Sequence, residues 1–166
     1  MKTALFALML LPLTVQPAQA QSWSGTDWRS PRGLHSASIS VQKNEFGLAI
    51  NCDETAQVTR ILRLLFSGPA LPRLYGRDGQ EETLLLSFDE GAHTREWQVY
   101  YFDGGLGDQA WIGELGSTDE ALSALANAQT VSILNTDREL IYVFPAKGTS
   151  AGVQLLRETC GLGANW

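Results

Sequence analysis

The segment FDEGAHTREW places two carboxylates and an imidazole close together in the sequence, at Asp89, Glu90 and His93. These side chains are ligands for divalent metals and can also act as general acids or bases. Their spacing is not that of a helical His-Glu-x-x-His motif. A polar hairpin turn around Gly91 would use the same residues for solubility and geometry. The segment therefore supports either a metal or acid–base site or an ordinary turn.

A second acidic segment, FDGGLGDQAW, holds Asp103 and Asp108 around three glycines. It is similar to one calcium-binding nonapeptide, but Asp108 follows Gly107 directly, which is one residue too early, and a lone copy has no neighbour on which to stack. A hairpin loop that needs positive φ also explains the glycines. A metal-dependent hydrolase or calcium-binding module is thus an alternative function, with candidate ligands Asp89, Glu90, His93, Asp103 and Asp108.

Nucleophilic catalysis finds little support in the sequence. There is no Gly-x-Ser-x-Gly elbow, and the neighbours His35 and Ser36 would point to opposite faces of a strand. We therefore expect a non-enzymatic protein that needs no cofactor.

The segment SGPALPRLYGRDGQEE, residues 67–82, is longer than most connections inside a compact domain. Loops held by a rigid sheet often carry binding residues, and Arg and Tyr are favoured at interfaces. Arg73, Tyr75 and Arg77 are therefore candidate binding residues, with a disordered surface insertion as the alternative.

Residues 1–20, MKTALFALMLLPLTVQPAQA, have the pattern of a secretory signal peptide. Lys2 precedes an apolar run that is too short for a membrane span, and Ala18-Gln19-Ala20 forms a cleavage site. We expect cleavage after Ala20 and a periplasmic or secreted protein without stable membrane insertion.

The formal net charge is −6 for the whole chain, and removal of Lys2 makes it one unit more negative. Nucleic acids and anionic membrane surfaces require a basic face, so the acidic balance argues against both as partners. An acidic balance permits another envelope or secreted protein as partner, although it also serves solubility.

After the leader, the chain contains two cysteines, Cys52 and Cys160. In an oxidising compartment such a pair predicts one disulfide. Alternation in FGLAINC turns Cys52 to the apolar face of a strand, and Val153, Leu156 and Cys160 share one face of a helix. A reactive thiol is not favoured, because the C-terminal end of a helix opposes a thiolate. A bridge closing a loop of roughly 100 residues corresponds to about 4.7 kcal/mol of stability.

Short apolar segments separated by turn residues predict strands. They cover residues 35–41, 45–52, 61–67, 83–88, 96–102, 109–115, 130–136 and 139–145. Asp-Arg after Thr136 predicts that the last two form a hairpin.

Two helices are predicted, at about 117–128 and 149–160. Ser117 and Glu120 form a capping box for the first, while Thr149 or Ser150 caps the second and Gly161 ends it. The resulting fold class is α+β: a mostly antiparallel sheet or sandwich with two helices at one end and one disulfide. Residues 35–166 form the single domain, after an arm at residues 21–34 that packs loosely.

The pattern L-x-I-x-C, the segment ALSALANAQTV and the tail YVFPAKGTSAGVQLLRETC together resemble envelope proteins of the invasion-associated locus B type. The tail is also similar to that of type VI secretion-associated periplasmic proteins. The matching positions are Leu48, Ile50, Cys52, Phe144, Gly148, Leu155 and Cys160. The resemblance implies an exported accessory or binding role and carries over no catalytic residue.

The leading hypothesis is a periplasmic binding or accessory protein, such as a secretion-associated factor or an inhibitor of a secreted enzyme. A third hypothesis is cell-wall glycan binding, should Trp23, Trp28 or Trp166 be exposed together.

Overall fold

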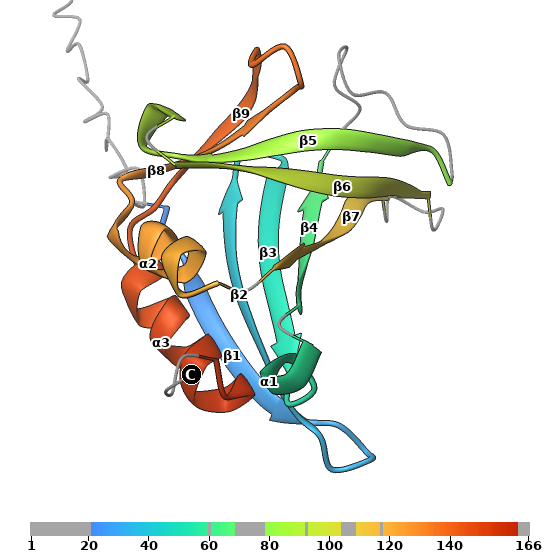
Figure 1. Ribbon diagram of the computed structural model, residues 1–166, viewed down its shortest axis with the longest axis vertical. Helices are drawn as coiled ribbons and strands as arrows, with labels where there is room; N and C mark the ends of the chain where they lie inside the picture. Colours follow the sequence, from blue (N-terminus) through green and yellow to red (C-terminus); the bar gives the residue numbers. More distant parts are fainter. Residues whose placement is uncertain are drawn as a thin grey trace, which may run out of the picture.

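The computed structural model describes residues 21–59, 61–68, 79–91, 93–103, 109–116 and 118–162, without the side chains of Glu90 and Asp119. The leader lies outside these residues. The described chain forms nine strands and three helices around one core, which is an α+β fold (Figure 1). None of its helices is long and apolar enough to cross a lipid bilayer.

All nine strands belong to one antiparallel sheet with the order β1-β2-β3-β4-β7-β6-β5-β8-β9. The strands are β1 (Ser24–Arg29), β2 (His35–Lys43), β3 (Phe46–Asp53), β4 (Ile61–Ser67), β5 (Glu81–Phe88), β6 (His93–Asp103), β7 (Gln109–Gly116), β8 (Thr130–Leu134) and β9 (Leu140–Pro145). The sheet curls so strongly that β5 and β6 run across the direction of β2, β3 and β4 (Figure 1). Of the two expected architectures, the structure contains the single curled sheet rather than a sandwich.

The curl brings the two ends of the sheet into contact. The backbone N–H of Trp23 donates to the carbonyl of Lys147 at 2.8 Å, and its indole Nε1 donates to the carbonyl of Pro145 at 2.8 Å. The Lys43 ammonium, at the end of β2, donates to the carbonyl of Val143 in β9 at 2.7 Å. These bonds join both ends of the sheet without a continuous ladder between β1 and β9.

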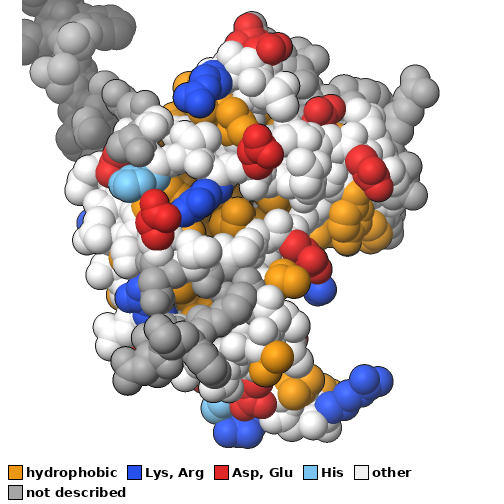
Figure 2. Space-filling model, viewed as in Figure 1, with side chains coloured by type: hydrophobic (Ala, Val, Ile, Leu, Met, Phe, Trp, Pro, Cys, Tyr) orange, Lys and Arg blue, Asp and Glu red, His pale blue; other side chains and the backbone are white. Residues whose placement is uncertain are grey.

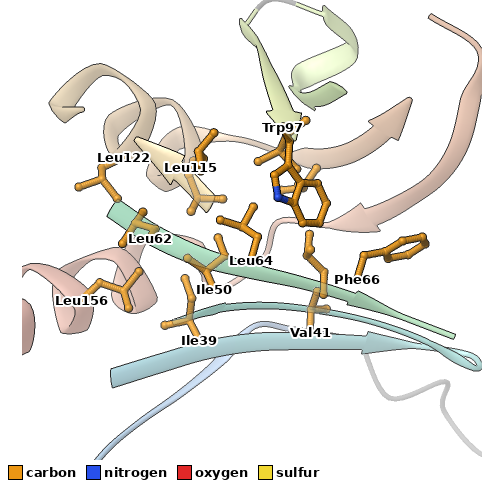
Figure 3. Packing of buried hydrophobic residues seen from close by; sticks show 14 of the residues in the cluster. Ile39, Val41, Ile50, Leu62, Leu64, Phe66, Trp97, Leu115, Leu122 and Leu156 are labelled. Carbon is orange, nitrogen blue, oxygen red and sulfur yellow. The ribbon is translucent and has the colours of Figure 1, made fainter. Parts of the chain in front are cut away.

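Alternation along the strands separates a core face from an outer face. The apolar side chains of β2, β3 and β4 point toward Trp97 of β6 and toward the helices (Figure 3). Trp97 is fully buried, and its ring passes over Gly113 of β7, where a Cβ would lie only 2.4 Å from the indole Nε1. Gly113 is therefore required by this close approach.

The helices are α1 (Ala56–Thr59), α2 (Asp119–Asn127) and α3 (Thr149–Cys160), and a 3₁₀ turn, η1, spans Asp89–Gly91. Helix α3 packs against β2 and β1, and α2 lies beside α3 (Figure 1). In α3, Gly152 faces Ile39 of β2 so closely that a Cβ would lie 3.0 Å from its Cγ2 atom. The short α1 was not predicted, because one turn is too short for a periodic pattern.

The helix caps differ in part from the prediction. The N-cap of α2 is Thr118, whose hydroxyl accepts from the Ala121 N–H at 3.1 Å; Ser117 lies outside the described residues. The N-cap of α3 is Gly148 at φ 92°, with no side-chain cap, because the Thr149 hydroxyl instead donates to the carbonyl of Ala146. Gly161 ends α3 at φ 65°, as predicted.

The loosely packed arm predicted for residues 21–34 is wrong. Residues 24–29 form strand β1, which pairs with β2 from Ser24 opposite Ser40 to Arg29 opposite His35. All six residues of β1 are exposed, so the strand has no buried face that would require alternating apolar residues. The sequence therefore lacks the pattern from which a strand is predicted. The strand is held instead by its pairing and by the buried Trp23 that precedes it.

Candidate functional site

The predicted acidic residues lie at opposite ends of β6. Asp89 and His93 are near its beginning and Asp103 is its last residue, and ten steps at about 3.3 Å separate His93 from Asp103 by roughly 33 Å. Asp89 has a structural role, because its Oδ1 atom accepts from the backbone N–H groups of Gln129 at 2.6 Å and Thr130 at 3.2 Å. The structure therefore does not bring these groups into one site.

The other candidate ligands add no cluster within the described part of the chain. The Asp103 carboxylate accepts from the side-chain amide of Gln109 at 3.3 Å. Asp108 and the Glu90 side chain lie outside the described residues. Among the side chains that are described, no group of three His, Cys, Asp or Glu is placed to hold a metal ion.

The two cysteines form the predicted disulfide. Cys52 in β3 is bonded to Cys160 at the end of α3, with 6.2 Å between the Cα atoms. Both residues are buried, with exposed fractions of 8% and 1%. The bond therefore fixes the last helix to the sheet, as the sequence predicts.

The loop candidates Arg73, Tyr75 and Arg77 lie outside the described residues. Among the tryptophans, Trp23 is buried, which removes it from any exposed aromatic group, while Trp28 is 46% exposed. Trp166 also lies outside the described residues.

A groove that sequence analysis did not identify lies on the outer face of β1, β2, β3, β4 and β7. It has a volume of about 390 Å³. Its strand side chains alternate with the core residues of the same strands, and Thr55, just before α1, and Thr59, at the end of α1, also line it. The strand residues with side chains on this face are Trp28, Ser36, Asn51, Asp53, Ile61, Arg63 and Glu114.

The floor of the groove contains a polar atom without a partner. The Oδ1 atom of Asn51 is buried and makes no hydrogen bond within the described part of the chain. Leaving a buried acceptor unpaired costs about 1–3 kcal/mol, so a ligand whose donor bonds to this atom after the side-chain amide turns toward the groove would recover part of this free energy. Asn51 is thus the clearest sign that this groove is built for an occupant.

A positive and a negative side chain are neighbours at the centre of the groove, and Asp53 adds a second carboxylate. Arg63 of β4 lies directly opposite Glu114 of β7, and the neighbouring Asn51 lies opposite Arg63 on the other side. Guanidinium, carboxylate and amide groups present fixed planar sets of donors and acceptors. Trp28 and Ile61, 46% and 39% exposed, provide apolar surface on one side of them. The arrangement suits a ligand with both hydrogen-bonding groups and apolar faces.

A second groove of about 480 Å³ lies on the outer face where β5, β8 and β9 meet. Its floor contains Ser87 and Ser132, which lie opposite each other on β5 and β8, and Arg138 lies at its rim.

Hydrophobic side chains also gather between acidic groups where β6 ends and β7 begins (Figure 2). The exposed aromatic residues of that part of the sheet are Tyr100 and Phe102.

The sequence does carry one signal for the first groove. Asn51, Arg63 and Glu114 each occupy the outward phase of an alternating strand, so their exposure is predictable. That they lie side by side depends on β4 pairing with β7 rather than with β5, which follows it in the chain.

No family model matches this sequence, and no curated protein or solved structure matches it either.

Proposed function

We propose that this chain is an exported, non-enzymatic binding protein of the cell envelope, and that its ligand lies in the groove formed by Trp28, Asn51, Arg63 and Glu114. The unpaired, buried Oδ1 atom of Asn51 is the observation that carries the proposal. A fully packed structural surface would satisfy this acceptor or replace it with an apolar group.

Export is supported by the disulfide and by the leader-like residues 1–20. A bond between two buried cysteines persists in an oxidising compartment, such as the periplasm or the extracellular space. The resemblance to locus B and type VI secretion-associated envelope proteins belongs to the same proposal. An accessory role, as a secretion-associated factor or as an inhibitor of a secreted enzyme, would use the groove as its contact.

Capture from an envelope extract tests the proposal. The chain beginning at Gln21, immobilised through a C-terminal tag, should retain material that Asn51→Ala and Arg63→Ala lose. Arg138→Ala is the matched control, because it removes the same charged group from the rim of the second groove. Equal retention by all four proteins would refute the role of the groove.

Replacement of residues 67–82 by Gly and Ser tests the predicted loop contact in the same assay. If the loop variant loses the material while Asn51→Ala and Arg63→Ala retain it, then Arg73, Tyr75 and Arg77 are the binding residues and the groove is not the site.

A further inference from the structure

The floor of the first groove belongs to a longer row of polar residues that crosses seven strands. In the observed register, each member lies opposite the next on the neighbouring strand, and all of them are on the outer face. The row runs Thr26, Ser38, Asn51, Arg63, Glu114, Gln98 and Thr83, on β1, β2, β3, β4, β7, β6 and β5. Resting on the function proposed above, we infer that this row is the binding track for one strand of a neutral, linear glycan.

The dimensions of the row fit an extended polymer. Neighbouring strands are about 4.8 Å apart, so six steps give a path of roughly 29 Å measured along the curled sheet. A single small molecule would fill only the part between Trp28 and Glu114. A row that continues with hydrogen-bonding side chains as far as Thr83 offers contacts to several consecutive units of one chain.

Apolar side chains border the row on both sides. Trp28 and Ile61 lie on one side, each two residues from a row member along its own strand. On the other side, Leu65, Ile112 and Tyr100 lie opposite one another across β4, β7 and β6. Sugar rings have apolar C–H faces and polar edges, so a glycan can place its hydroxyl groups on the row and its ring faces on the borders. The half-exposed indole of Trp28 is the strongest such platform.

The chemistry of the row favours a saccharide over a peptide. An extended peptide binds a sheet mainly through backbone hydrogen bonds to a free edge. The row crosses six strands, β2 to β7, that are paired on both sides, and only β1 lies at an edge, so its floor offers side chains almost throughout. A sugar hydroxyl can accept from an Arg63 N–H, and it can donate to the neighbouring Asn51 Oδ1 atom once that side chain turns to expose it.

The charge of the row favours a neutral chain. Arg63 and Glu114 are neighbours of opposite sign and are the charged members of the row. An anionic polymer would meet Glu114 and the nearby Asp53 in the same groove, whereas a cationic polymer would meet Arg63. Neutral sugars avoid both repulsions and still use each charged group as a strong hydrogen-bonding partner.

Calorimetric titration with β-1,4-linked oligomers of N-acetylglucosamine and of glucose tests the inference. Each series would comprise the monosaccharide, the disaccharide and the hexasaccharide. The hexasaccharide of at least one series should bind at least tenfold more tightly than its disaccharide, because it reaches row members beyond Glu114. Binding should also change the tryptophan fluorescence, and Trp28→Tyr should reduce this change.

Two variants separate the near and far parts of the track. Asn51→Ala should weaken both the disaccharide and the hexasaccharide, each by roughly fivefold for one lost hydrogen bond. Gln98→Ala should weaken only the hexasaccharide, because Gln98 lies three steps, about 14 Å, from Asn51 along the row. Arg138→Ala should change neither. Since Gln98 is exposed, its truncation is compatible with folding, which near-ultraviolet circular dichroism would check.

The outcomes separate this inference from the function on which it rests. If neither series binds, or if length and Gln98→Ala have no effect, the glycan track is wrong. Should envelope material still be lost by Asn51→Ala, the groove then binds another class of partner. Groove-independent capture would instead remove the proposed function itself.

Discussion

Removal of the disulfide should be the most damaging single chemical change to this protein. Cys52 and Cys160 are separated by 108 residues, so the bond restricts almost the whole unfolded domain. The chain-entropy treatment gives about 4.7 kcal/mol for a loop of this size. For a domain of this length, that loss would lower the midpoint of thermal unfolding by roughly 15 °C.

Urea unfolding at equilibrium, followed by tryptophan fluorescence, would measure the loss in three proteins. The oxidised and reduced wild types share the same sulfur atoms, so their difference isolates the covalent link. The variant Cys52→Ala/Cys160→Ala also loses buried volume, because the two residues are only 8% and 1% exposed. It should therefore be less stable than the reduced wild type by about 1 kcal/mol or more.

The reasoning would be refuted if the oxidised and reduced wild types unfolded within about 1 kcal/mol of each other. That result would mean that the reduced unfolded chain remains compact, or that α3 is held to β2 and α2 by packing alone. A loss of about 4.7 kcal/mol on reduction, with a further loss of about 1 kcal/mol or more in the double variant, would confirm both parts of the reasoning.

Three further substitutions test the local arguments through urea unfolding. Gly113→Ala should cost about 3 kcal/mol, because a methyl group would lie 2.1 Å from the Gln98 carbonyl oxygen. The control Gly116→Ala should be nearly neutral, because its methyl group would meet no atom of the described residues within 4 Å. Equal losses would contradict the close packing. Thr118→Ala should cost about 1 kcal/mol by removing the cap of α2, and Thr118→Ser should not. Asp89→Ala should cost about 1 kcal/mol or more, through its two backbone contacts and because alanine is less favourable than aspartate at φ 49°. Asp89→Asn should cost less, because the amide oxygen can still accept and asparagine tolerates this φ; identical losses for both would argue against these contacts.

The strands were predictable because one face of the sheet is buried. In β3, β4 and β7, residues of the core face alternate with polar ones, and a period of two leaves little ambiguity about the element. Helix α3 was predicted at its full length because its apolar stripe ends at a glycine. In β1 neither face is buried, so the pattern that identifies a strand is missing.

The groove could not be predicted, because it depends on pairings between strands that are distant in the sequence. Arg63 and Glu114 are neighbours only because the chain between β4 and β7 folds back as the β5-β6-β7 meander. A different strand order with the same alternation would bury the same core residues and separate the polar ones. Conversely, Asp89, Glu90 and His93 were predicted to form a site because they are close in the sequence. In the structure, the Asp89 carboxylate accepts hydrogen bonds from the backbone N–H groups of Gln129 and Thr130.

The division between core face and outer face gives Asn51 its significance. Most residues of the row are at least partly exposed, so their polarity costs the fold little. Asn51 is also partly exposed, but its Oδ1 atom is buried and has no hydrogen-bond partner among the described residues, at a strand position that a β-branched apolar residue would suit better. A residue type that lowers the free energy of unfolding at its position is expected where function requires that residue. Asn51 in β3, the central strand of the groove, therefore lowers the stability of the unbound protein, and a ligand that hydrogen-bonds to its Oδ1 atom would raise it.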